Sequence, residues 1–510
     1  MSNKLFGAIY IGSYEVSLKI FEFSQKKKMR EIDNVRSRID LGKDAYNKGI
    51  LGYELVEQLC DTLCQFKTIM TGYKVNDYEI YASAVLRDIE NELFVLDQIY
   101  LITGLNVKVI TNSEIRFLSY KSVAGRDSFD DFIKTSAAIV DIGGANIQIT
   151  YFKNGELVTT QHIETGTMRI SSLLYDNGNT EKTYRNIIQE YLIKKFNVLK
   201  NLYMQDGVEC VVFLNDYGMD LVNHIGKEPN TDNRIKSKKM VKYLDELLKL
   251  SLTDITKNLN MSNDTDSLII PNIMIYKTII NLFEPNEIWI PGANINDGIA
   301  YDYAQKNNQI KILHDFDEDI ISASKQLSKH YNSYSMHIDM LVALSKKIYK
   351  STKKLHGLGK REELLLEVAA MLHDCGKYIS LTSGPESAYH IIMSSEIIGL
   401  THAERQIVAY TVLFNALPLV DYDEISDQLD RESFLTVAKL SAILRVANAL
   451  DQSHRQKFEN TRITIKGREI IFTVESLEDI SLEQILFEKK TAYFEKIFSV
   501  KPVLKEKKSY

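Results

Sequence analysis

The stretch that most constrains the fold is residues 139–152, which read IVDIGGANIQITYF. An apolar run, the acidic Asp141, the pair Gly143 and Gly144, and a second alternating run predict two strands joined by a tight turn. Backbone N–H groups in a glycine turn can point at anionic oxygens, and without Cβ atoms the backbone approaches a ligand closely. The turn therefore indicates a phosphate site, and a β-hairpin with a buried Asp cap is the alternative interpretation.

Asp141, just before the turn, has a different predicted role. A carboxylate beside a phosphate repels it unless Mg²⁺ or a water molecule lies between them. We therefore expect Asp141 to hold a metal ion or a water beside the phosphate.

A second copy of this pattern lies near the N-terminus, in residues 8–20, AIYIGSYEVSLKI. Gly12 and Ser13 occupy its turn, and alignment on the glycines places Tyr10 where Asp141 falls in the other copy. Two such hairpins, each opening one half of an α/β unit, predict a duplicated architecture with a cleft between the halves. Phosphates are expected between the two turns.

The length of the chain predicts more than one domain, because 510 residues exceed what a single hydrophobic core accommodates. Strands alternating with helices predict mostly parallel sheets covered by helices up to about residue 315. Beyond that point amphipathic helical patterns predominate, and strand-like runs are absent until residues 463–473. The predicted domains are 1–125 and 126–315, both α/β, and 316–510, which is all-α.

The charge balance, 62 basic against 68 acidic residues for a net charge of −6, argues against a protein that coats nucleic acid or membranes by bulk charge. No signal peptide and no apolar run of about 18 residues is apparent, so no membrane span is predicted. The four cysteines offer neither a disulfide framework nor a zinc pattern. This usage indicates a reducing cytoplasm.

The order and spacing of several motifs together resemble the exopolyphosphatase / guanosine pentaphosphate phosphohydrolase family, a branch of the actin, sugar-kinase and heat-shock-ATPase fold. The motifs are the two glycine turns, residues 82–91, residues 107–123, Gly166 with Arg169, and residues 294–298. The resemblance implies two actin-like (ribonuclease H-like) α/β domains and a helical HD-like C-terminal domain. It also implies a Mg²⁺ or Mn²⁺ cofactor, a homodimer, and removal of the terminal phosphate from polyphosphate or guanosine pentaphosphate.

The positions that match the family's phosphate-binding motifs come from three segments of the chain. They are Gly12, Ser13, Arg87, Gly143, Gly144 and Asn146. Asp141 matches a catalytic and metal-holding position. For Arg87 the alternative is a surface residue paired with Asp88 or Glu90.

The chain departs from the family pattern at several acidic positions. Tyr10 stands where the family usually has an acidic residue, and Gln148 where it has a glutamate; Gln keeps the shape of Glu but cannot take a proton. The catalytic glutamate aligns with Glu114 when Arg116 is the anchor, and with Ile115 when the strand before it is the anchor. We take Glu114 as the predicted catalytic base.

In the third domain, residues 369–377, AAMLHDCGK, resemble the HD phosphohydrolase signature. The resemblance implies a divalent metal held by His373, Asp374 and the upstream His337. Asn448 stands where the family pattern has a further aspartate. The alternative is a helical scaffold in which His373 and Asp374 are a hydrogen-bonded remnant.

Three hypotheses for function follow. The first is an exopolyphosphatase-like hydrolase with reduced activity, because part of its carboxylate set is substituted. The second is a protein that binds polyphosphate, guanosine pentaphosphate or guanosine tetraphosphate without hydrolysing it. The third is a sugar-kinase-like ATPase of the same fold. Neither nucleic acid nor a membrane is a predicted partner.

Overall fold

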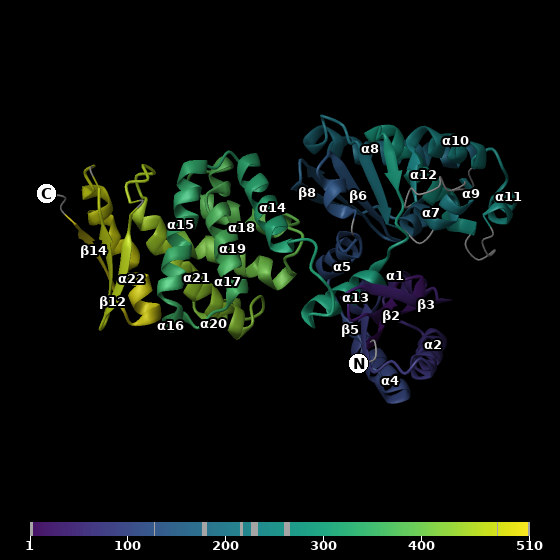
Figure 1. The fold of residues 1–510 in the computed structure, drawn as a ribbon, viewed down its shortest axis with the longest axis horizontal. Coiled ribbons are helices and arrows are strands. Elements are labelled where there is room, and N and C mark those ends of the chain that lie inside the picture. The colour runs from purple at the N-terminus through teal and green to yellow at the C-terminus, as the bar shows by residue number, and fades with distance from the viewer. Residues whose placement is uncertain are drawn as a thin grey trace. The chain divides into compact units, whose positions relative to one another are not determined.

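The computed structural model describes residues 4–126, 128–175, 181–214, 218–225, 233–259, 266–458, 460–476 and 478–507. They form two compact units, Met1–Asp315 and Phe316–Tyr510, called unit 1 and unit 2 below. Figure 1 shows sheets flanked by helices in unit 1 and mainly helices in unit 2.

Unit 1 contains two β-sheets. The first has the strand order β3-β2-β1-β4-β5 and the second the order β10-β11-β9-β6-β7-β8. The strands of the first sheet are β1 (Lys4–Ile11), β2 (Glu15–Phe23), β3 (Met29–Arg38), β4 (Asp77–Ala82) and β5 (Lys108–Val109). Those of the second sheet are β6 (Ala137–Ile142), β7 (Ile147–Lys153), β8 (Glu156–Ile163), β9 (Cys210–Leu214), β10 (Arg234–Lys236) and β11 (Glu287–Trp289).

The two sheets repeat one topology. In the first, β1 pairs antiparallel with β2 and parallel with β4, and β2 pairs antiparallel with β3; in the second, β6, β7, β8 and β9 take the same places. The turns match as well, since the N–H of Gly12 donates to the carbonyl of Glu15 and that of Gly143 to the carbonyl of Asn146, both at 2.9 Å. The predicted duplication of the hairpin is confirmed.

The helices of unit 1 cover the sheets and bury a separate apolar core against each. Their bounds are α1 (Leu41–Lys48), α2 (Tyr53–Gly72), α3 (Ala84–Arg87), α4 (Glu92–Thr103), α5 (Asn112–Ala124), α6 (Phe129–Ile133), α7 (Thr167–Tyr175), α8 (Glu181–Tyr203), α9 (Gly218–Ile225), α10 (Ser237–Leu247), α11 (Leu252–Asn258), α12 (Asp266–Phe283) and α13 (Ile295–Lys306).

Two helices, α5 and α13, cross between the halves of unit 1. The crossing is so close that a Cβ atom on Gly298 would lie 1.8 Å from the carbonyl oxygen of Leu118. An ion pair of 2.7 Å between Lys121 of α5 and Asp302 of α13 reinforces the crossing, and both side chains are nearly buried. Only glycine permits this approach of one helix to the backbone of the other.

The start of α13 is attached to the first sheet by buried polar groups. The Ser17 hydroxyl donates to Asn296 at 2.9 Å. The Lys19 ammonium, only 2% exposed, lies 2.7 Å from Asp297 and 2.9 Å from Glu31. Burial opposes this charge, but the two carboxylates outweigh it and raise the pKa of Lys19. Lys19 therefore stays charged and connects the second half of the sequence to the first sheet.

Unit 2 is built mainly of helices. Their bounds are α14 (Phe316–His330), α15 (Ser335–Ser351), α16 (Lys353–His356), α17 (Lys360–Leu372), η2 (Cys375–Tyr378), α18 (Gly384–Ser394), α19 (His402–Ala416), α20 (Tyr422–Ile425), α21 (Arg431–Leu450) and α22 (Ser481–Phe498).

The prediction that residues 316–510 are all-α is wrong in one region. Unit 2 also holds a three-stranded sheet of β12 (Arg462–Lys466), β13 (Glu469–Val474) and β14 (Lys501–Glu506). Apolar residues at Ile463 and Ile465 alternate with polar ones in β12, and β13 is almost continuously buried. β14 follows α22 in the sequence and pairs with β13 in parallel. A short, charged segment does not by itself predict such a long-range pairing.

One helix, α21, is long and apolar enough to cross a membrane by length and composition. In this structure 67% of its most apolar window is buried inside the protein. A central core helix passes the same test, and α21 packs in that way within unit 2.

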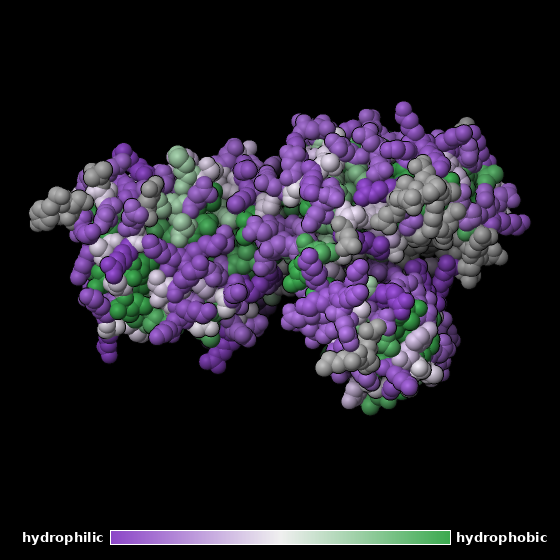
Figure 2. Space-filling model, in the orientation of Figure 1, coloured by the Kyte–Doolittle hydropathy of each residue, from purple (hydrophilic) through white to green (hydrophobic). Residues whose placement is uncertain are grey.

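Most side chains on the face shown in Figure 2 are hydrophilic. An exception is α4, whose Leu93, Phe94 and Leu101 are 79%, 76% and 72% exposed. These side chains form one apolar area, and other green areas are visible on the same face.

We expect Gly298→Ala to destabilise unit 1, because the added methyl group must displace either α5 or α13. Overpacking of this kind costs about 1–3 kcal/mol. The matched control is Gly72→Ala at the end of α2, where an added methyl group would have nothing within 4 Å of it. Chemical denaturation should show a lower midpoint for the first variant and no loss for the second; equal midpoints would mean that the crossing tolerates a larger separation.

Candidate functional site

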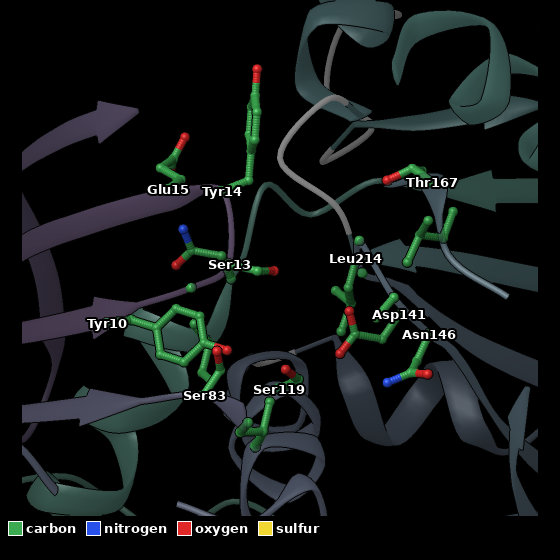
Figure 3. A pocket seen from close by; sticks show the side chains of 18 of the residues that line it. Tyr10, Ser13, Tyr14, Glu15, Ser83, Ser119, Asp141, Asn146, Thr167 and Leu214 are labelled. Atoms are coloured by element: carbon green, nitrogen blue, oxygen red, sulfur yellow. The ribbon is translucent and has the colours of Figure 1, made fainter. Parts of the chain in front are cut away.

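A cavity of about 330 Å³ lies between the two halves of unit 1, and both glycine turns line it. Figure 3 shows Tyr10, Ser13 and Glu15 on one side and Asp141, Asn146 and Thr167 on the other, with Ser119 of α5 below them. The start of α13 forms a further part of the wall through Ala293, Asn294, Ile295 and Asn296.

Five of the six predicted phosphate-binding residues line this cavity. They are Gly12, Ser13, Gly143, Gly144 and Asn146. The structure brings together two turns that lie about 130 residues apart in the sequence. The N–H groups of Gly12 and Gly143 already donate to the backbone carbonyls that close the two hairpins. Any contact from these turns to an anion must therefore come from other groups.

The second turn is held in place by the start of α7. The carbonyl of Gly144 accepts hydrogen bonds from the N–H groups of Met168 at 2.9 Å and Arg169 at 3.2 Å, and that of Gly143 accepts from Thr167 at 3.2 Å. Gly166 packs directly beneath, where a Cβ atom would lie 2.3 Å from the carbonyl oxygen of Gly144. The carbonyls therefore face the helix, away from a bound anion.

Three guanidinium groups line the cavity: Arg36 and Arg38 from β3, and Arg116 from α5. Two carboxylates join them, Glu15 and the predicted Asp141. Glu15 lies 3.7 Å from Arg36. Among the described lining residues the positive charges therefore outnumber the negative ones, which favours a polyanionic ligand.

Arg87 is not among the residues that line the cavity. Its guanidinium donates to Asp88 at 2.9 Å and to the carbonyl of Ile110 at 3.5 Å. The alternative interpretation of Arg87, a surface residue paired with Asp88, therefore describes its position, and the prediction of a phosphate contact does not agree with the structure. α3 ends at Arg87, and this places the side chain beside the next residue.

The predicted base Glu114 is also placed away from the cavity. Its carboxylate accepts from both the N–H and the hydroxyl of Thr111, each at 2.8 Å, in a capping box at the start of α5. Ile115 and Arg116 line the cavity instead. Side chains of adjacent residues in a helix point about 100° apart. Because α5 directs Ile115 and Arg116 into the cavity, the side chain of Glu114 points away from it, toward the N-terminus of the helix.

Two further polar residues reach the cavity: Gln148 of β7, which the sequence analysis placed where the family has a glutamate, and His162 of β8, which it did not mention. Gln148 is 7% exposed, and its Nε2 lies 3.5 Å from the Thr150 hydroxyl. Its Oε1 has no hydrogen-bond partner among the described residues, a situation that costs about 1–3 kcal/mol in a closed interior. His162 of β8 lines the cavity beside it. In a strand, alternate residues point to the same face of the sheet. Applied to the predicted hairpin, this alternation could have placed both residues on the face that carries Asp141.

In unit 2 the three predicted metal ligands do come together. His337 Nε2 lies 3.2 Å from His373 Nε2, and His373 Nε2 lies 3.2 Å from Asp374 Oδ1. His373 sits at the end of α17 and His337 in the first turn of α15. Burial lowers the pKa of the His373 imidazole to about 4, so this ring is neutral at pH 7.

The hydrogen bonds of the two imidazoles determine which nitrogens carry lone pairs. His373 Nδ1 lies 2.8 Å from the carbonyl of Ala370, and His337 Nδ1 lies 2.7 Å from the Asp451 carboxylate. Both partners accept hydrogen bonds, so each Nδ1 carries a proton. The neutral ring of His373 therefore has its lone pair on Nε2. This lone pair, His337 Nε2 and the Asp374 carboxylate converge, an arrangement that a proton or a cation must stabilise.

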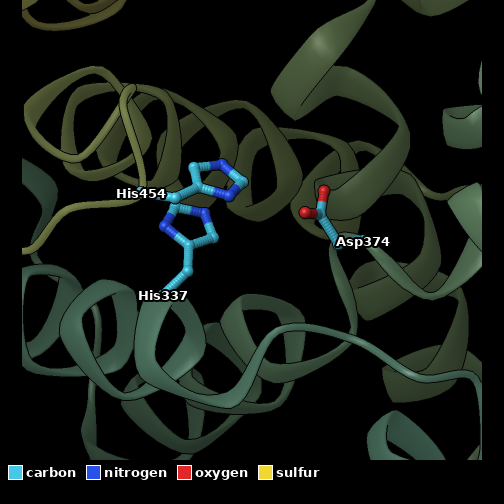
Figure 4. A group of neighbouring side chains, drawn as sticks. All are labelled: His337, Asp374 and His454. Atoms are coloured by element: carbon cyan, nitrogen blue, oxygen red, sulfur yellow. The ribbon is translucent and has the colours of Figure 1, made fainter.

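A fourth group, missed in the sequence, is His454. Ligand atoms of His337, Asp374 and His454 all lie within 4.8 Å of one another. Figure 4 shows these three side chains. The His454 ring stacks on that of His337 with centroids 3.7 Å apart, and its backbone has a φ of 56°. The sequence contained an indication of this group that was overlooked: Asp451 and His454 lie three residues apart, directly after α21.

Two family models match this chain. The model of the Ppx/GppA phosphatase family matches residues 20–307, more than half of the chain, and that of Ppx/GppA phosphatase domain III matches residues 322–490. The first covers most of unit 1 and the cavity wall from Arg36 to Asn296, but not the turn at Gly12 and Ser13. The second covers most of the helices of unit 2.

Curated relatives are similar over most of the chain. A guanosine-5'-triphosphate,3'-diphosphate pyrophosphatase of Aliivibrio fischeri is 20% identical over 465 residues, which is 87% of each protein. One of Vibrio atlanticus is 19% identical over 411 residues, 79% of each.

Solved structures share the fold of unit 1. An exopolyphosphatase from Cytophaga hutchinsonii aligns with a TM-score of 0.53 at 16% identity, over 61% of this chain and 99% of that one. An Aquifex aeolicus Ppx/GppA family member aligns with a TM-score of 0.50 at 19% identity, over 60% and 99%. The duplicated sheets are thus those of an actin-like ATPase-type fold.

We expect Glu114→Gln to leave ligand binding and any phosphate release unchanged, because Gln at this position still completes the capping box. Glu114→Ala removes that bond and should cost about 1 kcal/mol of unfolding free energy. Parallel activity assays and denaturation curves check both statements. A large loss of rate in Glu114→Gln with native stability would instead mean that α5 turns Glu114 into the cavity during the reaction.

Proposed function

We propose, since this chain belongs to the Ppx/GppA phosphatase family, that unit 1 binds a phosphate polymer in the cavity between its sheets and hydrolyses the terminal phosphoanhydride bond. The substrate class is inorganic polyphosphate or guanosine pentaphosphate. The activity of the named relatives, a guanosine-5'-triphosphate,3'-diphosphate pyrophosphatase and an exopolyphosphatase, is consistent with this choice.

The observation that carries the proposal is the composition of the cavity wall. Two glycine turns and three guanidinium groups line the same cavity as Asp141. Guanidinium groups bind phosphate oxygens through paired hydrogen bonds and neutralise the charge that spreads over them. Phosphoryl transfer depends mainly on such positioning and charge stabilisation.

The residues present fit a Mg²⁺ ion in a minimal way. Mg²⁺ takes oxygen ligands, often one or two carboxylates together with substrate phosphates, and Asp141 and Glu15 supply two carboxylates from opposite halves. The ion would supply charge neutralisation for the phosphoryl oxygens. Asp141 would orient it, while Arg36, Arg38 and Arg116 hold the rest of the chain of phosphates.

Three features favour a slow hydrolase. Tyr10 stands where the family usually has a carboxylate. Ile115, and not Glu114, is the α5 residue at the cavity wall, and Gln148 lines the cavity but cannot take a proton. The second candidate function, a protein that senses polyphosphate or guanosine pentaphosphate or tetraphosphate without hydrolysis, is supported by the same losses. Both functions need the guanidinium groups, so only turnover separates them.

We expect the purified chain to release phosphate from long-chain polyphosphate or guanosine pentaphosphate in the presence of Mg²⁺ or Mn²⁺. Asp141→Asn keeps the size of the side chain but removes its charge, so release should fall by about 100-fold or more. Phosphate release and equilibrium binding, measured on the same preparations, check this prediction. Tight binding by the wild type with no release above the variant's background would identify the sensor.

Two arginine variants serve as a matched pair for the binding measurement. Arg116→Gln removes a guanidinium from the cavity and should weaken binding of either phosphate polymer. Arg87→Gln removes one that pairs with Asp88 outside it and should not. Equal losses in both variants would indicate a general effect of net charge and argue against the cavity as the binding site.

For unit 2 we also propose a divalent transition-metal site of HD-like character. His337, His373, Asp374 and His454 supply three imidazoles and one carboxylate, a set that suits Zn²⁺, Mn²⁺ or Fe²⁺ better than Mg²⁺. Asp451 accepts the Nδ1–H of His337 and so orients its Nε2, the arrangement found behind many metal-bound imidazoles. The converging groups described above support the proposal.

We expect the full chain to bind one Zn²⁺ or Mn²⁺ ion, measured by titration calorimetry after chelator treatment and by elemental analysis. His373→Asn and His454→Asn should each weaken binding by at least about 10-fold, whereas His390→Gln, an exposed histidine of the same unit, should not. Unchanged stoichiometry and affinity in both ligand variants would leave the cluster as a hydrogen-bonded remnant.

A further inference from the structure

A row of three polar side chains crosses the second sheet within the cavity. In the strand register Asp141 of β6 lies opposite Gln148 of β7, and Gln148 lies opposite His162 of β8. All three line the cavity. Directly opposed residues lie on one face of a sheet with Cβ atoms about 5 Å apart. A carboxylate, an amide and an imidazole therefore stand side by side, in that order.

The amide in the middle of the row points to a ligand. Gln148 is more than nine-tenths buried, and its Oε1 has no hydrogen-bond partner among the described residues. A carbonyl oxygen requires a donor, and an ionised phosphate oxygen has no hydrogen to donate. A water molecule beside the phosphate has two hydrogens, one for Gln148 and one for a neighbouring base.

The first sheet carries an equivalent row with different chemistry. Tyr10 of β1 lies opposite Ser17 of β2, and Ser17 lies opposite Arg36 of β3, and these three also line the cavity. Arg36 occupies the place that His162 has in the second sheet. The first half therefore offers a cation for phosphate oxygens, while the second half offers groups that exchange protons.

His162 is the best candidate for a proton acceptor. Among the described lining residues the groups able to take a proton near neutral pH are Glu15, Asp141 and His162. Glu15 lies 3.7 Å from Arg36 in the cationic half, and Asp141 is the carboxylate suited to a metal ion. The ordinary pKa of an imidazole, about 6.5, is close to the pH at which a general base is most effective.

We propose that His162 is the general base of this cavity and that Gln148 holds the attacking water between His162 and the terminal phosphate. The water oxygen forms a bond to the terminal phosphorus, and the bond from that phosphorus to the bridging oxygen breaks. The shortened polyphosphate leaves with the bridging electron pair, and the water proton moves to the imidazole, which later returns it to solvent. This inference rests on the proposed hydrolytic function.

The test is the pH dependence of phosphate release from long-chain polyphosphate by the full chain and by His162→Gln. The wild type should lose activity as the pH falls, because a protonated imidazole cannot accept the proton of the water. The variant should release phosphate about 10²–10⁴-fold more slowly and lack this limb, with polyphosphate affinity and thermal midpoint unchanged. In His162→Gly, added imidazole should restore part of the rate. His390→Gln is the matched control and should behave as the wild type.

Other outcomes overturn the inference in recognisable ways. A variant that keeps the wild-type rate and pH profile shows that Asp141 or solvent accepts the proton, and the hydrolytic function stands. A variant that loses polyphosphate affinity in proportion to its rate shows that His162 binds phosphate rather than acting as the base. If the wild type releases no phosphate at all, the hydrolytic function itself fails, and the assignment of His162 fails with it.

Discussion

The crossing of α5 and α13 at Gly298 is the contact on which the site in unit 1 depends. α13 follows the second sheet in the sequence but is attached to the first by Ser17 and Lys19, and α5 lies against it at backbone distance. This arrangement directs the turn ends of β1 and β6 toward one cavity. It also sets the rotation of α5, and so decides that Ile115 and Arg116 face the cavity while Glu114 caps the helix.

Duplication of one hairpin has produced two walls with separate tasks. The rows Tyr10–Ser17–Arg36 and Asp141–Gln148–His162 occupy equivalent strand positions, yet the first carries a cation and the second carries groups that bind or exchange protons. An enzyme that has lost carboxylates from such a site keeps its affinity for phosphate more readily than its rate, since guanidinium groups and turns are sufficient for binding. Under the proposed function, the balance between hydrolysis and sensing would therefore depend on whether the remaining groups can accept the proton of the attacking water.

Unit 2 gathers its histidine cluster from segments far apart in the sequence. The chain turns after α21 and brings His454 against His337, and the Asp451 carboxylate lies 2.7 Å from Nδ1 of His337. The left-handed backbone at His454 is uncommon for residues other than glycine, although histidine adopts it more often than most, and here it accompanies the stacking of the His454 ring on His337. The imidazoles of His337 and His373 are each oriented by an acceptor that cannot donate a proton back.

From the order of amino acids alone it follows that two glycine hairpins open two similar halves, that Asp141 stands beside the second turn, and that His337, His373 and Asp374 belong to one helical unit. These conclusions rest on local patterns, in which turn residues and strand or helix periodicity act over a few neighbours. The tertiary structure decided what depends on distant contacts. It paired Arg87 with Asp88, and the rotation of α5 turned Glu114 out of the cavity. It also brought Arg36 and His162 to the cavity from outer strands whose polar sequences do not predict a site. A side chain's direction is set by the packing of its whole element against others, and no short stretch of sequence contains that information.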